Sequence, residues 1–215
     1  MKELLKNNQV KVIGEAIQSF ILSHETHGEK FYSSELLIQR KSGVYDLIPI
    51  LVSEHLMDFS KEYRGSFFNI TGQLRSHNQI IDGRTKVLTN VFVQEVDVLK
   101  ELPRNDFINN NSVKLSGYLC KKPQYRETPF GRKITELLLA VDRPYGKSDY
   151  IPCICWGRTA LFATKLTVGQ RVQIEGRIQS RDYQKKISES ETETKTTYEV
   201  SAQKILPGVS VGEES

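Results

Sequence analysis

The chain has little cysteine and no long apolar run, and each shortage excludes a class of protein. Its 215 residues include three cysteines, an odd number that does not support a disulfide framework and favours a reducing compartment. No apolar stretch approaches the roughly 20 residues that a membrane helix needs. Residues 1–8 lack the long apolar segment of a secretory signal. We therefore expect a cytoplasmic protein with no membrane partner.

The motifs of catalysis are also missing. Gly146-Lys147-Ser148 imitates the end of a phosphate-binding loop, but Val141 stands where that motif requires glycine, and a strand is expected next. No Gly-x-Ser-x-Gly elbow and no placed pair of carboxylates is present. The histidines offer no third metal ligand and are scattered over His24, His27, His55 and His77. We expect no enzyme activity, no cofactor and no metal site.

The charge of the chain permits a nucleic-acid partner but does not require one. The net charge is +4, with 26% charged and 38% hydrophobic residues, which is ordinary for a soluble globular protein. From residue 126 to residue 186, basic residues interleave with aromatic rings. Acidic residues follow at Glu189, Glu191 and Glu193, a run that is most simply the solvated tip of a loop.

An internal repeat divides the chain into two halves. Gly14 and Gly117 end similar segments and are 103 positions apart, and Arg40 and Arg143 keep the same offset. Asp46-Leu47-Ile48-Pro49 likewise matches Asp149-Tyr150-Ile151-Pro152, and an offset of 104 relates Gly72-Gln73-Leu74 to Gly176-Arg177-Ile178. A chance match would rarely keep this register. Each copy has about 100 residues, the usual size of a small domain.

The order of elements in the second copy predicts an OB-fold. Alternating apolar residues indicate strands over 113–119, 134–141, 149–158, 171–180 and 196–205, with a short helix over 159–166 after the third. A long exposed hairpin is expected over 182–195. Three strands, a helix and two strands form a five-stranded Greek-key barrel, a fold that binds oligonucleotides on one face.

The first copy fits the same order. Its strands are expected near 10–14, 31–40, 45–52, 67–76 and 87–98, with a helix near 54–63. The predicted fold class is all-β, two tandem OB-folds that each carry one short helix. The predicted domains are a diverged OB-fold (1–101), a linker (102–111), an OB-fold that binds single-stranded DNA (112–207) and a short tail (208–215).

The strand over 149–158 presents two different faces. Because side chains alternate along a strand, Ile151, Cys153 and Cys155 share one face, which suits a core. Tyr150, Pro152, Ile154 and Trp156 share the other, which would present rings for stacking on unpaired bases. The opposite arrangement, with Ile154 and Trp156 in the core, fits this strand alone equally well.

Three stretches resemble the bacterial single-stranded DNA-binding protein family. They are residues 111–117, residues 149–158 and residues 169–178, the last with the specific pattern Gly-x-x-Val-x-Ile-x-Gly. The resemblance covers the second copy well and the first weakly, and the whole chain looks like a two-OB form of the family. It implies that rings on this sheet stack on bases, at the positions that hold Tyr145, Tyr150, Trp156 and Tyr183.

The cations around these four rings are expected to contact phosphates. Any one of them alone is more often a solvated charge. Together they form the predicted basic set, which comprises Arg126, Arg132, Lys133, Arg143, Lys147, Arg158, Arg177, Arg181, Lys185 and Lys186.

Two departures from the family pattern qualify the resemblance. The first copy holds Ser42, Leu47 and Ser53 where the second holds Tyr145, Tyr150 and Trp156, so it is expected to bind single strands more weakly. Tyr45 and His77 are candidates for partial replacement, although each is more simply a surface residue, and an alternative role for this copy is assembly. The family also carries a long acidic-tipped tail that recruits partners. The ending at residues 211–215 gives no expectation of tail-mediated recruitment of replication or repair proteins.

These observations predict a nucleoid-associated protein that binds and protects single-stranded DNA, with little sequence preference, in replication, recombination or repair. The resemblance implies four OB-folds per assembly, so a homodimer is expected. One alternative is an OB-fold adaptor that holds a protein partner in a replication or conjugation assembly. Another is a nuclease accessory or weak enzyme, for which no constellation is found.

Overall fold

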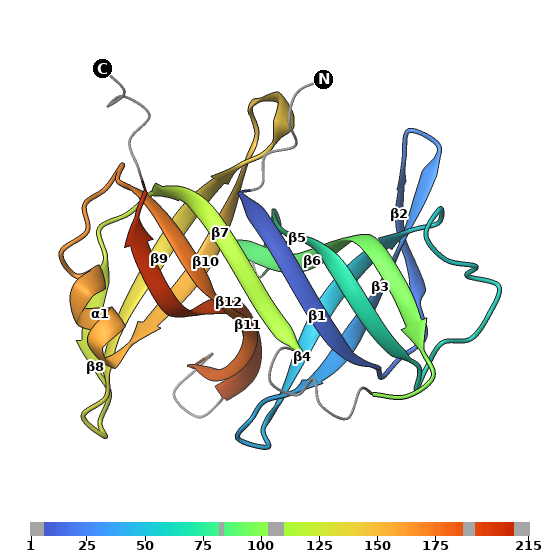
Figure 1. The fold of residues 1–215 in the computed structure, drawn as a ribbon, viewed down its shortest axis with the longest axis horizontal. Helices are drawn as coiled ribbons and strands as arrows, with labels where there is room; N and C mark the ends of the chain where they lie inside the picture. Colours follow the sequence, from blue (N-terminus) through green and yellow to red (C-terminus); the bar gives the residue numbers. More distant parts are fainter. Residues whose placement is uncertain (1–6, 82–83, 103–109, 187–191, 209–215) are drawn as a thin grey trace.

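The computed structural model describes residues 7–81, 84–102, 110–186 and 192–208. Throughout these ranges the protein is all-β: its strands form one continuous sheet that closes into two adjacent barrels (Figure 1). The predicted fold class, two tandem OB-folds, is confirmed in its strand order.

The first barrel closes in the order β1-β3-β4-β6-β5 and back to β1. Its neighbours are antiparallel except for β4 and β6, where Ile50 pairs with Val91 in parallel. Its strands are β1 (Asn8–Ala16), β3 (Glu29–Gln39), β4 (Tyr45–Ser53), β5 (Phe67–Ile81) and β6 (Arg84–Leu99).

The second barrel repeats this topology strand for strand, in the order β7-β9-β10-β12-β11 and back to β7. Its parallel pair is β10 and β12, and α1 (Gly157–Ala163) follows β10 as expected. Its strands are β7 (Asn111–Leu119), β9 (Lys133–Asp142), β10 (Ser148–Trp156), β11 (Arg171–Lys186) and β12 (Thr192–Pro207). β7 begins one residue inside the range expected for the linker.

Three short elements differ from the sequence predictions. No helix forms over the described residues 54–63, where turns replace the helix expected in the first barrel. Instead, the rings of Phe20 and Tyr63 pack on Phe68 at this end of the barrel, and Phe59 packs on Phe20. The strands β2 (Ile21–Thr26) and β8 (Gln124–Glu127) were not predicted; both are exposed along their whole length and show no alternation.

The repeated glycines mark the places where strands cross closely. Gly72 and Gly176 each follow a β-bulge at the corner of their barrel. A Cβ atom at either position would collide with a carbonyl oxygen of the neighbouring strand, that of Phe92 or of Ser201. The offset of 104 residues therefore repeats a barrel corner, which explains why the glycine recurs.

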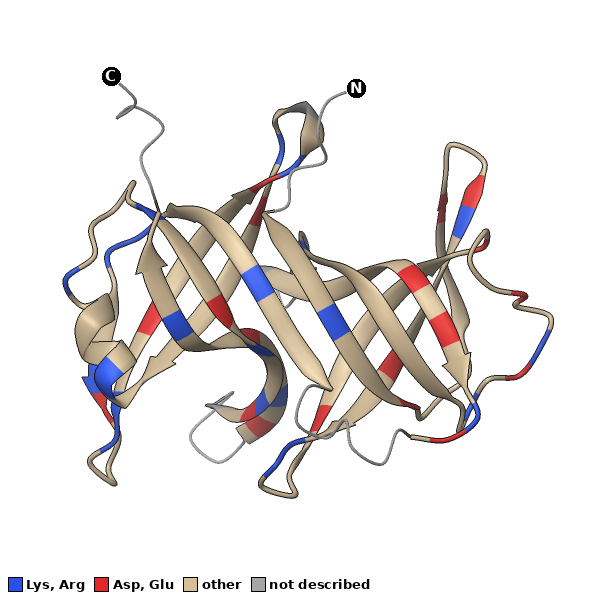
Figure 2. Cartoon of the chain, in the orientation of Figure 1, with Lys and Arg blue, Asp and Glu red and all other residues tan. Residues whose placement is uncertain are grey.

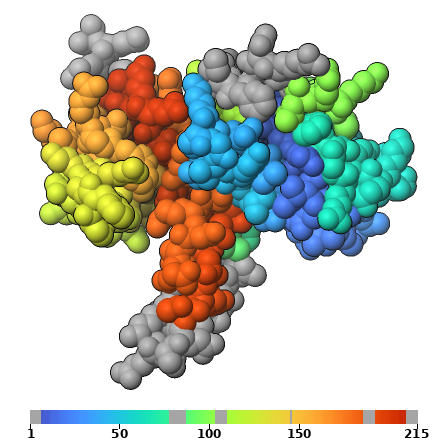
Figure 3. Space-filling view, turned by 90° about the horizontal axis from the view of Figure 1, so that it is seen from below, coloured from blue at the N-terminus to red at the C-terminus, as the bar shows by residue number. Residues whose placement is uncertain are grey.

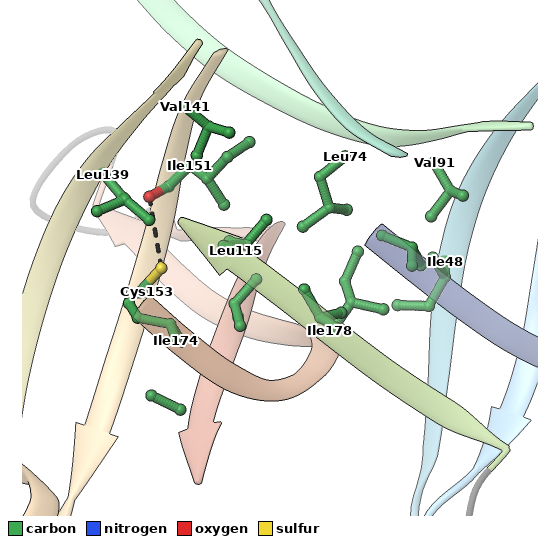
Figure 4. Packing of buried hydrophobic residues seen from close by; sticks show 14 of the residues in the cluster. Ile48, Leu74, Val91, Leu115, Leu139, Val141, Ile151, Cys153, Ile174 and Ile178 are labelled. Atoms are coloured by element: carbon green, nitrogen blue, oxygen red, sulfur yellow. Dashed lines mark hydrogen bonds between the residues drawn. The ribbon is translucent and has the colours of Figure 1, made fainter. Parts of the chain in front are cut away.

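β1 and β7 join the two barrels side by side. They pair antiparallel with Val10 opposite Val113, so the sheet runs unbroken from one barrel to the other. The buried side chains of both barrels form one cluster; Figure 4 shows Leu74 and Val91 of the first barrel near Ile178 and Leu115 of the second. The two halves therefore pack against each other and are not independent domains joined only by a linker.

The ends of β11 and β12 form an arm. Asp182 to Lys186 pair with Thr192 to Thr196, as the predicted long hairpin requires, and the arm projects from the body of the molecule (Figure 3). The arm carries both signs of charge (Figure 2), including the ion pair of Lys195 with Glu193 at 2.9 Å.

Candidate nucleic-acid interface

β10 presents its two faces largely as its alternation predicts. Ile151, Cys153 and Cys155 are buried in the core, whereas Tyr150 is 46% exposed and Trp156 is 36% exposed. Ile154 is the exception, because it lies on the outward-facing set yet is buried. Two rings are therefore presented to solvent from one strand.

The backbone of β10 fixes the position of both rings. The amide N–H of Tyr150 donates a hydrogen bond of 2.7 Å to Oγ of Ser76 in the other barrel. Trp156 is the last residue of β10, and Gly157 then adopts a φ of 57°, which glycine tolerates without strain, and turns the chain into α1. A ring on a fixed strand loses little conformational freedom when a flat ligand stacks on it.

The two cysteines on the other face of this strand are buried in the core. Burial raises the pKa of Cys155 to about 12, and burial raises that of Cys153 well above its usual value. Both thiols are therefore protonated at neutral pH and behave as small apolar side chains.

Arg143 and Arg177, two of the predicted phosphate contacts, are bound to buried carboxylates. Arg143 donates to both carboxylate oxygens of Asp149, at 2.6 Å for its Nε, and Arg177 donates to Asp46 at 3.2 Å. Both aspartates are fully buried. The two arginine side chains remain about one quarter exposed, so each guanidinium also faces solvent.

Each aspartate also holds an arginine that was not predicted as part of the site. Arg75 donates to Asp149 at 3.1 Å, and Arg40 donates to Asp46 at 2.5 and 2.7 Å. Burial lowers the pKa of Arg75, and the hydrogen bond to Asp46 raises that of Arg40. Two guanidinium groups per carboxylate leave each cluster with a net positive charge.

The other predicted cations fall into two groups. Arg126 pairs with Glu136 at 2.8 Å, and Arg181 pairs with Glu199 at 3.2 Å, so their charges are partly compensated. The remaining four described cations have exposed side chains: Arg132, Lys133, Lys147 and Arg158. Lys147 and Arg158 lie at the two ends of β10, just outside the strand that carries both rings.

The remaining predicted ring and lysine positions lie on or beside the arm and the β9–β10 turn. Tyr183 is half-buried and lines a depression of about 390 Å³ between the arm and β6, with Val87 and Leu88 on the far side. The side chains of Tyr145, Lys185 and Lys186 lie outside the described part of the structure. Their role in binding stays a prediction, as does that of the other predicted site residues.

The first barrel does not present a matching pair of rings. Ser53, the counterpart of Trp156, is buried, donates a hydrogen bond to Glu29 and accepts one from the amide of His55. Leu47, the counterpart of Tyr150, is half-buried, and its amide is held by Ser180. Tyr45 and His77 are exposed, as expected of surface residues.

Among the described residues, no group of three or more His, Cys, Asp or Glu side chains is arranged to hold a metal ion. In those same ranges, no helix has both the length and the apolar character needed to cross a bilayer.

The fold and this face define a tandem OB-fold protein whose second barrel displays two rings and several cations. Residues 110–207 match the profile of the "Single-strand binding protein family". The match covers the second barrel, from β7 to the end of β12.

Curated relatives match the same half. A "Single-stranded DNA-binding protein" of Clostridium tetani is 40% identical over 83 residues, which cover 35% of this chain and 57% of the relative. The "Single-stranded DNA-binding protein A" of Bacillus subtilis is 36% identical over 81 residues, which cover 34% of this chain and 47% of the relative. The chain spans about half the length of the curated relatives it matches.

The whole two-barrel architecture has a solved counterpart. The wild-type "single-stranded DNA binding protein from Thermus aquaticus" superimposes with a TM-score of 0.74 over 97% of this chain and 96% of that chain, at 20% identity. A deletion mutant of the same protein gives 0.74 at 22% identity. At this identity the likeness establishes the tandem fold.

Proposed function

We propose that this protein binds single-stranded DNA with little sequence preference, through stacking on Tyr150 and Trp156 and phosphate contacts from the surrounding cations. The observation that carries the proposal is the pair of exposed rings on β10, in a barrel that matches the profile of the single-strand binding protein family. Aromatic faces accept any base, which accounts for the lack of sequence preference.

The proposed role is to keep strands apart and to protect them during replication, recombination or repair, without catalysing a reaction. Residues 112–207 are the proposed binding unit and residues 1–101 a diverged OB-fold, with 102–111 linking them and 208–215 as a tail. Two chains would supply four OB-folds, so the proposed state is a homodimer. The solution mass tests this state directly, and a monomeric mass would contradict it.

Trp156 is the sole tryptophan and therefore reports on its own site. Stacking on a base should quench its emission when oligo-dT is added. Affinity should fall with salt, with a log–log slope of about −0.7 for each phosphate contacted. Unchanged emission and salt-independent affinity would instead favour an adaptor that binds a protein partner.

A further inference from the structure

A groove of about 720 Å³ crosses the junction between the barrels. One side is formed by the β2–β3 hairpin with β4 and β6 of the first barrel. The other is formed by the turn between β9 and β10, which rises beside the junction in Figure 1. Ser76 lines the groove, and its hydroxyl holds the amide of Tyr150. The groove therefore reaches the backbone of Tyr150 in the second barrel.

The groove is positively charged. Arg75 and Arg143 line it and share the single buried carboxylate of Asp149, and Lys147 adds an exposed ammonium group. His24 and His77 also line it and are exposed. None of the described residues that line the groove is an aspartate or a glutamate. Such a surface favours a polyanion.

Rings accompany these charges. Phe92 lines the groove, and the guanidinium of Arg75 lies 5.7 Å from its ring centroid. Phe31 lies 5.9 Å from Phe92, and His24 stacks on Phe31 with centroids 5.1 Å apart and an interplanar angle of 13°. Flat groups of this kind accept an unpaired base, either on the ring or on the guanidinium plane.

The first barrel carries its exposed-side ring on a strand that is not the counterpart of β10. Phe92 pairs with Gln73 and, in parallel, with Leu51. Ser201 of the second barrel pairs with Arg177 and with Ile154, the equivalent partners. The first barrel has Leu47 and Ser53 on β4 where the second barrel has rings, and it has Phe92 on β6 where the second barrel has serine.

From these observations we propose that the groove is a second binding site for unpaired DNA, in which a strand that leaves Tyr150 crosses the junction and stacks on Phe92. Arg75, Arg143 and Lys147 contact its phosphates. The inference deepens the proposed function and rests on it. It assigns the first barrel a direct part in binding, through residues other than the counterparts of Tyr150 and Trp156.

The test compares oligo-dT of about 8 and about 32 nucleotides, half and twice the upper site size of about 16 for one OB-fold. Phe92→Leu removes the ring but keeps apolar bulk, His77→Ala with Lys147→Ala removes exposed groups, and Lys11→Ala is an exposed control on β1. We expect Phe92→Leu to weaken binding of the long oligonucleotide about five-fold or more, with a smaller effect on binding of the short one. The double variant should lower the slope of log affinity against log salt concentration. Lys11→Ala should change neither the affinity nor this slope.

Photocrosslinking with iododeoxyuridine in the long oligonucleotide gives an independent readout, because crosslinked peptides should include Phe92 or His24. Quenching of Trp156 together with crosslinks confined to the second barrel and unchanged affinity of the Phe92→Leu variant would overturn this inference and leave the proposed function standing. Absence of quenching and of binding by either oligonucleotide would overturn both.

Discussion

Asp46 and Asp149 occupy equivalent positions in the two barrels, and each receives one arginine from its own barrel and one from the other. Arg40 and Arg177 meet at Asp46, and Arg143 and Arg75 meet at Asp149. The backbone follows the same pattern, since Ser180 donates its amide hydrogen to Asp46 and Ser76 donates its own to Asp149. The junction is thus an interface between two copies that share one chain.

Side-chain amides extend this symmetry along the joining strands. The side chain of Asn8 bonds both the amide and the carbonyl of Leu74, and Asn111 does the same for Ile178. Each asparagine satisfies backbone groups that the barrel corner leaves without a ladder partner. We therefore expect the two barrels to unfold together, in a single transition.

Asp149→Asn tests this coupling. The substitution keeps the shape but removes the charge that two partly buried arginines share, so the free energy of unfolding should fall by about 3–5 kcal/mol. Urea denaturation followed by circular dichroism measures the change, with Lys11→Ala as an exposed control. A change below about 1 kcal/mol, or two separate transitions, would contradict an interface that ties both barrels.

The sequence predicted the repeat, the barrel order and the core face of β10 because these depend on local periodicity. Ile151, Cys153 and Cys155 follow the period of two that any half-buried strand shows. The prediction of a helix near residues 54–63 was wrong. This segment forms turns, and its rings, which include Phe59 and Tyr63, pack at this end of the barrel. Packing between distant segments decided this outcome, and no local pattern reports it.

The candidate site was harder to predict for the same reason. Arg143 and Arg177 were expected beside the rings, but their carboxylate partners are Asp149 on β10 of the second barrel and Asp46 on β4 of the first, respectively. A signal was present, since arginine precedes aspartate by six positions in both copies, at Arg40 and at Arg143. Phe92 and Arg75 had no such signal, because only the barrel corner brings them together.

Thiol reactivity should distinguish the three cysteines. Cys120 is half-exposed, and burial raises its pKa less than it raises the pKa of the other two. Cys153 and Cys155 are buried in the core with strongly raised pKa values. An aromatic disulfide reagent at pH 8 should therefore label one thiol in the folded protein and three in urea, as mass spectrometry can count. Rapid labelling of all three without urea would contradict the packing of β10.

Stability should decline at high pH through Tyr198. Its hydroxyl lies 3.5 Å from Glu35 of the first barrel, and burial, with a smaller contribution from that carboxylate, raises its pKa to about 12. Because the unfolded tyrosine titrates near 10, the unfolded chain loses its proton first. The contribution of Tyr198 is complete below pH 10 and is lost as pH rises towards 12.

The Tyr198→Phe variant isolates this effect. Between pH 9 and pH 11.5 the free energy of unfolding should fall by about 1–2 kcal/mol more in the wild type than in the variant, after allowance for solvent screening of a half-buried group. Subtraction removes the contributions of other groups that titrate in this range, including Cys155. Equal declines in both proteins would show that the surroundings of the Tyr198 hydroxyl do not raise its pKa.

Trp156→Leu and Trp156→Phe separate the chemistry of the ring from its bulk. Leucine keeps an apolar side chain at this 36% exposed position but offers no face for stacking, so affinity for labelled oligo-dT should fall by about 1–3 kcal/mol. Phenylalanine keeps a face and should recover most of the loss. Anisotropy of the labelled strand measures both, since the variants lack the tryptophan signal. Circular dichroism should show the same fold in all three proteins; unfolding of the leucine variant would mean that Trp156 serves the core, and equal affinities would mean that its ring does not touch DNA.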